Sequence, residues 1–170
     1  MLSTILQLEF KNAETNRRAE RVQAEAMLDT MTTAYNRRGW DWLMTLEEER
    51  CRLYGHPAAV LVLDLDNLKQ INDTSGHMAG DDVIVRTTQA LRQAVRSHDI
   101  VARLGGDEFG ILAVECPLEA ATALHQRIEA ALAAVHIVAS IGLSMRDPAT
   151  GLKAAWENAD QLMYQEKRTR

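Results

Sequence analysis

The stretch IVARLGGDEFGILAV, residues 100–114, decides the fold. Apolar residues dominate Ile100–Leu104 and Glu108–Val114, and the pair Gly105–Gly106 lies between the two runs. Two such runs joined by a short glycine turn predict a β-hairpin. We expect the turn to require positive φ at the glycines, which adopt that conformation without steric cost. Two acids, Asp107 and Glu108, follow the turn at once, and this makes the hairpin a candidate site.

The segments around the hairpin complete a β-α-β-β-α-β order. Residues 60–63 form an unbroken apolar run, which is typical of a central strand. The order matches the split-βαβ, ferredoxin-like pattern, an α+β fold with helices on one face of an antiparallel sheet. The strands outside the hairpin are expected at Ala58–Asp66 and Val135–Leu143, and the helices at Asn36–Tyr54, Asp81–Ser97, Pro117–Ala134 and from Gly151 onward.

The first 28 residues contain neither Gly nor Pro and predict a separate helix. Its heptad a and d positions form an imperfect apolar series: Met1, Ile5, Leu8, Asn12, Thr15, Ala19, Val22 and Ala26. Two interpretations carry equal weight, a solvated single helix leading into the domain and a short dimerising coiled coil. We therefore divide the chain into an N-terminal signalling or dimerisation helix, residues 1–28, and a compact domain, residues 29–170.

Composition limits the function classes. A net charge of −5 over 170 residues argues against a nucleic-acid polymer as partner, because such proteins carry a basic face. Cys51 and Cys116 lack metal-ligand spacing and are expected to be reduced thiols. The sequence holds neither an apolar run of about 18 residues nor the features of a signal peptide. We expect a cytoplasmic location, with membrane attachment only if the chain is part of a longer protein.

Two acidic clusters predict a metal site. Asp64 and Asp66 close the buried strand, and Asp107 and Glu108 follow the hairpin turn. In the β-α-β-β order these strands can be neighbours, so the carboxylates would converge at one edge. Carboxylates held close together repel each other, and Mg²⁺ relieves the repulsion with waters and phosphates completing its shell. The alternative is that the first pair merely caps the following helix.

The segment after the strand carries groups suited to a nucleotide. Lys69 can approach phosphates, while Asn72 offers donors and an acceptor to a base or sugar. Asp81 can accept two hydrogen bonds from a guanine edge, and His77 lies in the same segment. Each also has a structural interpretation: a solvated lysine, a turn asparagine, a helix N-cap and a local hydrogen-bonding histidine.

In order along the chain, these motifs resemble the GGDEF domain of diguanylate cyclases. Residues 105–109 match the signature pentapeptide. Further similar segments are Asp29–Thr32, Asn36–Arg38, Asp64–Asp73, Gly76–Asp81, Ala139–Gly142 and Ala159–Tyr164 with Lys167, so the resemblance covers Asp29–Arg170. It departs from the usual pattern at Thr33 and Ala34, where the family has Gly and Leu, and at Leu68, where it has Phe.

The resemblance implies that two GTP molecules condense to cyclic di-GMP with release of two pyrophosphates, in a homodimer with one GTP per domain. It implies Mg²⁺, with Mn²⁺ as the alternative ion, bound by Asp64, Asp107 and the carbonyl of Leu65. Asp107 would also take the proton of the 3′-hydroxyl, supported by Glu108. The GTP site implied by the resemblance comprises Lys69, Asn72, His77, Asp81, Gly105, Gly106 and Lys167.

A second site is implied nine residues before the glycine pair. Arg96 and Asp99 fit the family's RxxD inhibitory motif, in which cyclic di-GMP binds to the arginine fork and the aspartate. Elsewhere, such a pair at a helix end is usually a surface ion pair.

Two other functions remain open alternatives: a catalytically silent receptor for GTP or cyclic di-GMP, and a pure dimerisation module. Nothing in the sequence resembles a sensor, so an attached sensor domain is the expected source of an input signal.

Overall fold

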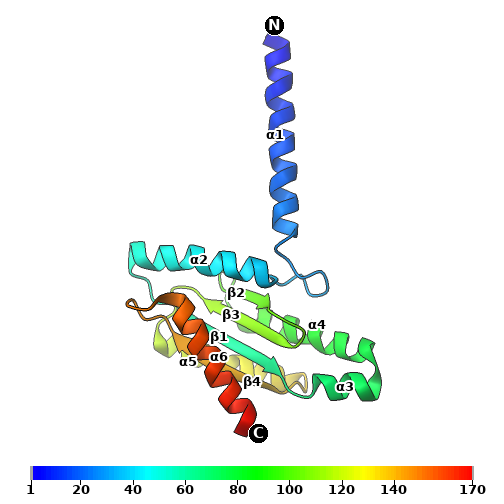
Figure 1. The fold of residues 1–170 in the computed structure, drawn as a ribbon, viewed down its shortest axis with the longest axis vertical. Coiled ribbons are helices and arrows are strands. Elements are labelled where there is room, and N and C mark those ends of the chain that lie inside the picture. The colour runs from blue at the N-terminus through cyan, green and yellow to red at the C-terminus, as the bar shows by residue number, and fades with distance from the viewer. Residues whose placement is uncertain (1, 170) are drawn as a thin grey trace.

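The computed structural model describes residues 2–169. Helix α1, Leu2–Glu25, projects away from a compact body that holds all the other elements (Figure 1). Met1 and the side chains of Ile5 and Leu8, three positions of the heptad series, lie outside the described part. None of the helices within residues 2–169 has the length and apolar character needed to cross a membrane.

A four-stranded antiparallel sheet forms the centre, in the order β2-β3-β1-β4. The strands are β1 (Ala59–Leu65), β2 (Ile100–Arg103), β3 (Glu108–Ala113) and β4 (Ala139–Met145). This arrangement confirms the ferredoxin-like α+β prediction and the hairpin. The last strand begins four residues later than expected, because residues 135–138 form the turn after the preceding helix.

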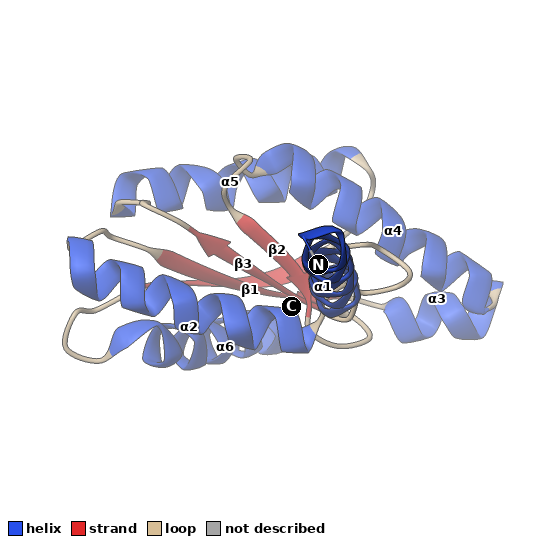
Figure 2. Cartoon of the chain, turned by 90° about the horizontal axis from the view of Figure 1, so that it is seen from above, coloured by secondary structure: helices blue, strands red, loops and turns tan. Residues whose placement is uncertain are grey.

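Helices cover both faces of the sheet (Figure 2). The two long helices between the strands lie on one face, as the β-α-β-β-α-β pattern predicts, and the helices that precede and follow the pattern cover the other face. Helices α4 (His77–Ala94) and α5 (Leu118–Ala134) pack on one face, where Leu61 and Leu63 point. Helices α2 (Arg37–Tyr54) and α6 (Gly151–Thr169) pack on the other, against Val60 and Val62. The unbroken apolar run of β1 explains this, because alternate residues of a strand face opposite sides.

A second correction concerns the start of α4. A short helix, α3 (Leu68–Ser75), precedes it, and α4 begins at His77 rather than at Asp81. Only Gly76, with φ of 85°, separates the two helices. Asp81 therefore lies within α4 and is not its N-cap.

The segment leading into α2 begins the compact body. Asn36 caps α2, its side chain accepting a hydrogen bond from the amide of Gly39. Thr33 has φ of 57°, which explains why glycine is usual there in the resembled family. Arg92 of α4 donates to both the hydroxyl and the carbonyl oxygen of Thr33 and stabilises this turn. Leu68, the other departure, is buried in the core.

Candidate active site

The two acidic clusters meet at one edge of the sheet. Asp64 at the end of β1 lies directly opposite Glu108, the first residue of β3. The amide of Leu65 donates to the carbonyl of Asp107 at 2.9 Å, which fixes the hairpin beside the end of β1. The antiparallel register thus places both clusters in one neighbourhood. Asp66 lies beside them and accepts a hydrogen bond from Ser140 of β4.

The carboxylates at this edge are held in an environment that disfavours their charge. Burial raises the pKa of Asp64, and the charge of Asp107 adds to the rise. Burial also raises the pKa of Glu108, with further rises from Asp160 on α6 and from Asp64. Negative charge that is only partly compensated attracts a cation.

Lys167, in the last turn of α6, supplies one positive charge to the edge. Its ammonium donates a hydrogen bond to Asp64 and forms an ion pair with it. This bond raises the pKa of Lys167 and opposes the rise at Asp64. The neighbouring Glu166 accepts from the amide of Ile141, so the end of α6 is fastened to β4.

The side chains present fit a hard divalent cation in kind. Within residues 2–169, no three His, Cys, Asp or Glu side chains gather closely enough to hold a metal ion by themselves. Asp64, Asp66, Asp107 and Glu108 offer carboxylate oxygens at this edge, where the charges of Asp64 and Asp107 repel each other, and Leu65 is the last residue of β1. Such a partial set suits Mg²⁺, which commonly keeps waters and substrate phosphates in its shell.

The hairpin tip differs from the expected turn. Neither Gly105 nor Gly106 has positive φ. Four residues, 104–107, separate β2 from β3, and loops of that length are most often built on a type I turn with negative φ. Both glycines are exposed, and a Cβ added at Gly106 would meet no heavy atom within 4 Å. The tip is therefore open to a ligand.

An ion pair that the sequence analysis did not single out positions the tip. Arg103, 13% exposed, pairs with Asp29 at 3.3 Å and donates to the carbonyl of Gly106 at 3.0 Å. Asp29 also accepts from the amide and hydroxyl of Thr32. The segment before α2 is thereby tied to the hairpin loop. The only available sequence signal was an arginine at the end of an apolar strand.

The nucleotide segment spans α3 and the start of α4. Lys69, His77 and Asp81 are exposed, so all three are accessible to a ligand. Asn72 is partly buried and lies against Gly80, and its amide oxygen has no hydrogen-bond partner within residues 2–169. The structure thus places these residues on one helical corner, beside the strand that carries Asp64.

The RxxD residues lie at the other end of β2 from the hairpin tip. The carboxylate of Asp99 accepts from the backbone amides of Arg96, at 2.9 Å, and Val114, at 3.2 Å. Its structural task is therefore to close the turn between α4 and β2. The side chain of Arg96 is exposed and accessible to an anion.

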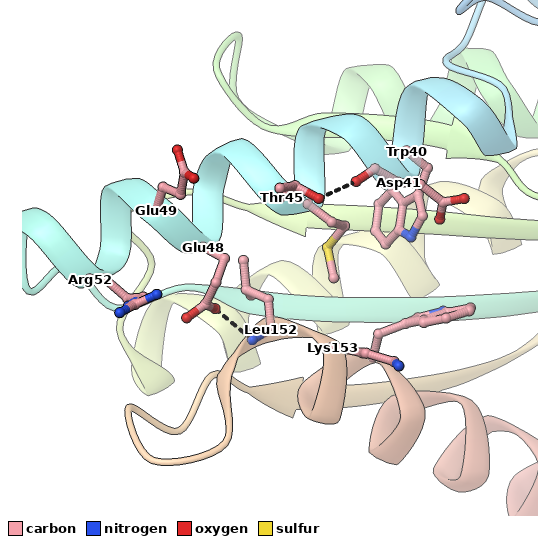
Figure 3. A pocket seen from close by; sticks show the side chains of 10 residues that line it. Trp40, Asp41, Thr45, Glu48, Glu49, Arg52, Leu152 and Lys153 are labelled. Carbon is pink, nitrogen blue, oxygen red and sulfur yellow. Dashed lines mark hydrogen bonds between the residues drawn. The ribbon is translucent and has the colours of Figure 1, made fainter.

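A separate hollow of about 440 Å³ lies between α2 and α6 (Figure 3). Trp40, Met44, Leu152 and Trp156 form its apolar lining, and none of the predicted site residues contributes to it. Trp40 also packs on Gly110 of β3, where an added Cβ would lie 3.0 Å from the indole ring. Trp40 thus lies both at the hollow and against β3, on the face of the sheet that α2 and α6 cover.

Comparison with known proteins agrees with this geometry. The sequence model of the diguanylate cyclase GGDEF domain matches residues 26–170. A probable diguanylate cyclase of Escherichia coli K12, DgcC, is 33% identical over 157 residues, which are 87% of this chain and 42% of that protein. The diguanylate cyclase DgcP of Pseudomonas aeruginosa is 35% identical over 85% of this chain and 23% of its own length. The chain thus spans less than half of these curated relatives.

A solved structure extends the likeness to the N-terminal helix. The coiled coil and GGDEF domain of DgcB from Caulobacter crescentus, crystallised with c-di-GMP, superposes with a TM-score of 0.84 at 26% identity. The match covers 98% of this chain and 95% of that one. With the acidic edge, the glycine loop and the sheet order in place, the chain belongs to the diguanylate cyclase GGDEF domain family.

Proposed function

We propose that this chain is a diguanylate cyclase domain that condenses two GTP molecules into cyclic di-GMP and two pyrophosphates. One observation carries the proposal: Asp64, Asp107 and Glu108 gather at one sheet edge beside an open glycine loop. Two curated relatives, DgcP of Pseudomonas aeruginosa and DosC of Escherichia coli, carry diguanylate cyclase activity in their names. The acids that a silent receptor would be free to lose are all retained, which disfavours that alternative.

The reaction is a nucleophilic substitution at phosphorus. The 3′-hydroxyl oxygen of each GTP bonds to the α-phosphorus of the other, so two bonds form. At each α-phosphorus the bond to the oxygen that bridges to the β-phosphate breaks, and two pyrophosphates leave. Asp107 accepts the proton of the hydroxyl, and Glu108 supports the carboxylate cluster around it. Mg²⁺, or Mn²⁺ as the alternative, would be held by Asp64, Asp107 and the carbonyl of Leu65, and would supply charge neutralisation and a lower pKa for the hydroxyl.

The remaining residues bind and orient GTP. Asn72 and Asp81 read the guanine from the corner between α3 and α4, with His77 lining the same pocket. Lys69 and Lys167 neutralise phosphate charge. The loop at Gly105–Gly106 lets the nucleotide approach the backbone, because no side chain stands there.

The domain acts as a homodimer, because each domain holds one GTP and the two nucleotides must face each other. Helix α1 brings the two domains together as a coiled coil. Its likeness to a solved chain described as a coiled coil with a GGDEF domain supports this assignment. We place the boundary between helix and catalytic domain between residues 28 and 29, where the turn that Asp29 holds through Thr32 begins.

Turnover with identification of the product tests the proposal. Purified protein with GTP and Mg²⁺ should form cyclic di-GMP, and Asp107→Asn should abolish the product while leaving the melting temperature close to that of the wild type. Unreacted GTP at high concentration of a confirmed dimer would refute the activity. Mn²⁺ in place of Mg²⁺ distinguishes the two candidate ions.

Product inhibition at Arg96 and Asp99 is a separate part of the proposal. The exposed guanidinium of Arg96 is suited to the phosphate and guanine of cyclic di-GMP. Arg96→Ala should weaken inhibition by added product without changing the initial rate. Asp99 is a poorer probe, since its carboxylate also closes a turn. Equal inhibition of wild type and Arg96→Ala by added product would show that Arg96 does not bind the inhibitor.

A further inference from the structure

Gly80 occupies a position in α4 at which the backbone does not require glycine. It is the fourth residue of the helix and is not among the residues with positive φ. A helix is less stable with glycine than with alanine at an interior position, because glycine loses more backbone freedom on folding. A glycine at such a position needs another explanation, and the space above its Cα provides one.

That space is filled by one side chain. A Cβ built on Gly80 would lie 1.9 Å from Oδ1 of Asn72, 2.8 Å from its Cγ and 3.2 Å from its Nδ2. Distances below about 3 Å cannot be accommodated without movement. Because the obstacle is the head of a short side chain, an added methyl group would displace the amide of Asn72 rather than unfold the helix. Figure 2 shows the two helices concerned, α3 and α4, lying side by side.

The amide oxygen of Asn72 lies in contact with Gly80. This atom is buried and has no hydrogen-bond partner within residues 2–169. The backbone at the same residue is fixed, because the carbonyl of Asn72 accepts from the amide of Gly76 at 2.9 Å. With its backbone anchored, the head group is located by contact with Gly80.

We propose that Gly80 is a specificity-determining position, which seats the amide of Asn72 where it reads the nucleobase. The inference rests on the proposed function, in which Asn72 recognises guanine. Gly80 touches no substrate and acts only through Asn72, so it is a positioning residue. A side chain at position 80 costs the domain its preference for GTP over ATP and leaves the acidic edge untouched.

A double-mutant cycle tests the proposal with the full chain and Mg²⁺, measuring GTP and ATP binding by calorimetry. Asn72→Ala and Gly80→Ala should each weaken GTP binding at least about tenfold and agree within about threefold, because both remove the same contact. The double variant should be no more than about twofold weaker than Asn72→Ala. ATP binding should stay unchanged throughout.

The melting temperature distinguishes a positioning role of Gly80 from a purely structural one. A purely structural role would lower the melting temperature when Gly80 is replaced. On the Asn72→Ala background the methyl group meets no amide, so Gly80→Ala should raise the melting temperature by about 2–4 °C through helix propensity. Weaker recognition with equal or greater stability is the expected signature. A fall in melting temperature on that background would show that position 80 packs against more than Asn72, and would overturn the proposal.

The binding outcomes separate this inference from the proposed function. If wild type prefers GTP to ATP but Gly80→Ala binds both nucleotides like wild type, then Gly80 does not position Asn72, and guanine recognition by the domain still holds. If the two losses of GTP affinity multiply in the double variant, Gly80 acts independently of Asn72, and the proposal is again refuted. If wild type binds GTP and ATP equally, guanine reading fails and this inference fails with it. Selective binding of GTP without turnover would contradict the cyclase activity. The double-mutant cycle would still decide whether Gly80 positions Asn72.

Discussion

The two ends of β1 carry opposite kinds of charge cluster. Beyond its start, Arg146 forms two hydrogen bonds with Glu48, at 2.7 and 2.9 Å, and the amide of Leu152 donates to the same carboxylate at 2.7 Å. These bonds lower the pKa of Glu48, with Arg146 as the principal cause. At the other end, burial and mutual repulsion raise the pKa of Asp64 and Glu108.

The difference separates charges that stabilise the fold from charges held ready for a ligand. Glu48 has its partners within the chain, and Arg146, at 5% side-chain exposure, has few alternatives in solvent. The carboxylates at the acidic edge are partly buried with too little positive charge around them. Such sites lower the stability of a free protein and become favourable when their ligand binds.

The largest expected effect comes from breaking the satisfied cluster. Arg146→Met should lower the free energy of unfolding by about 2–3 kcal/mol, because it leaves Glu48 without its charged partner. Chemical denaturation of wild type and variant at pH 7 measures the loss. GTP turnover by the folded fraction should stay unchanged, since the cluster lies at the far end of β1.

The pH dependence checks the cause. The folded-state pKa of Glu48 lies below its ordinary value of 4.5. The pair with Arg146 therefore stabilises the folded protein fully above pH 4.5, and this stabilisation is lost as the pH falls through the folded-state pKa. The stability gap between wild type and Arg146→Met should therefore narrow below about pH 4.5. A gap that is constant down to pH 3 would show that packing by the arginine stem, not charge, accounts for the loss.

The unsatisfied cluster should respond in the opposite direction. Glu108→Gln should raise the free energy of unfolding of the metal-free protein at pH 7, by less than the loss expected for Arg146→Met, because solvent screens the partly buried carboxylate. The folded-state pKa of Glu108 is raised, so ionisation costs stability at neutral pH and the cost is absent below its ordinary pKa of 4.5. The gain should accordingly disappear in acid, while cyclic di-GMP synthesis falls at pH 7. Unchanged or lower stability at pH 7 would contradict this.

The sequence predicted most of the fold because local patterns agreed with it. The apolar run at residues 60–63 and the hairpin at residues 100–114 both became strands in the expected order. The same run places apolar side chains on both faces of the sheet. The helices outside the β-α-β-β-α-β pattern therefore also find an apolar surface, on the second face.

The site was less predictable where tertiary contacts override local preference. The helix after the nucleotide segment was expected to begin at Asp81, and residues 75–80, with glycines at 76 and 80, were interpreted as a loop. In the structure Gly80 is helical, and its contact with Asn72 accounts for it. The pairing of Lys167 with Asp64, across 103 residues, has no local signature at all.

That pairing yields the smallest of the expected effects and the most direct probe of the acidic edge. In the metal-free protein Lys167 supplies the positive charge that a bound cation would otherwise give to Asp64. An ion pair with 41% and 18% side-chain exposure is worth about 0.5–1 kcal/mol. Lys167→Met should therefore tighten Mn²⁺ binding in the absence of nucleotide about two- to fivefold, as measured by electron paramagnetic resonance.

Lys153→Met provides the matched control, because it removes an exposed lysine from the other end of the same helix, on the rim of the hollow beside α2. It should leave Mn²⁺ affinity within about 1.5-fold of wild type, which accounts for the general loss of one positive charge. The advantage of Lys167→Met should shrink as salt rises and screens the pair. Mn²⁺ binding that is equal in both variants would mean that the lysine does not compete with the cation. Cation binding at the acidic edge of the free protein would then depend on the carboxylates alone. The contrast between the two ends of β1 would also rest on the carboxylates alone.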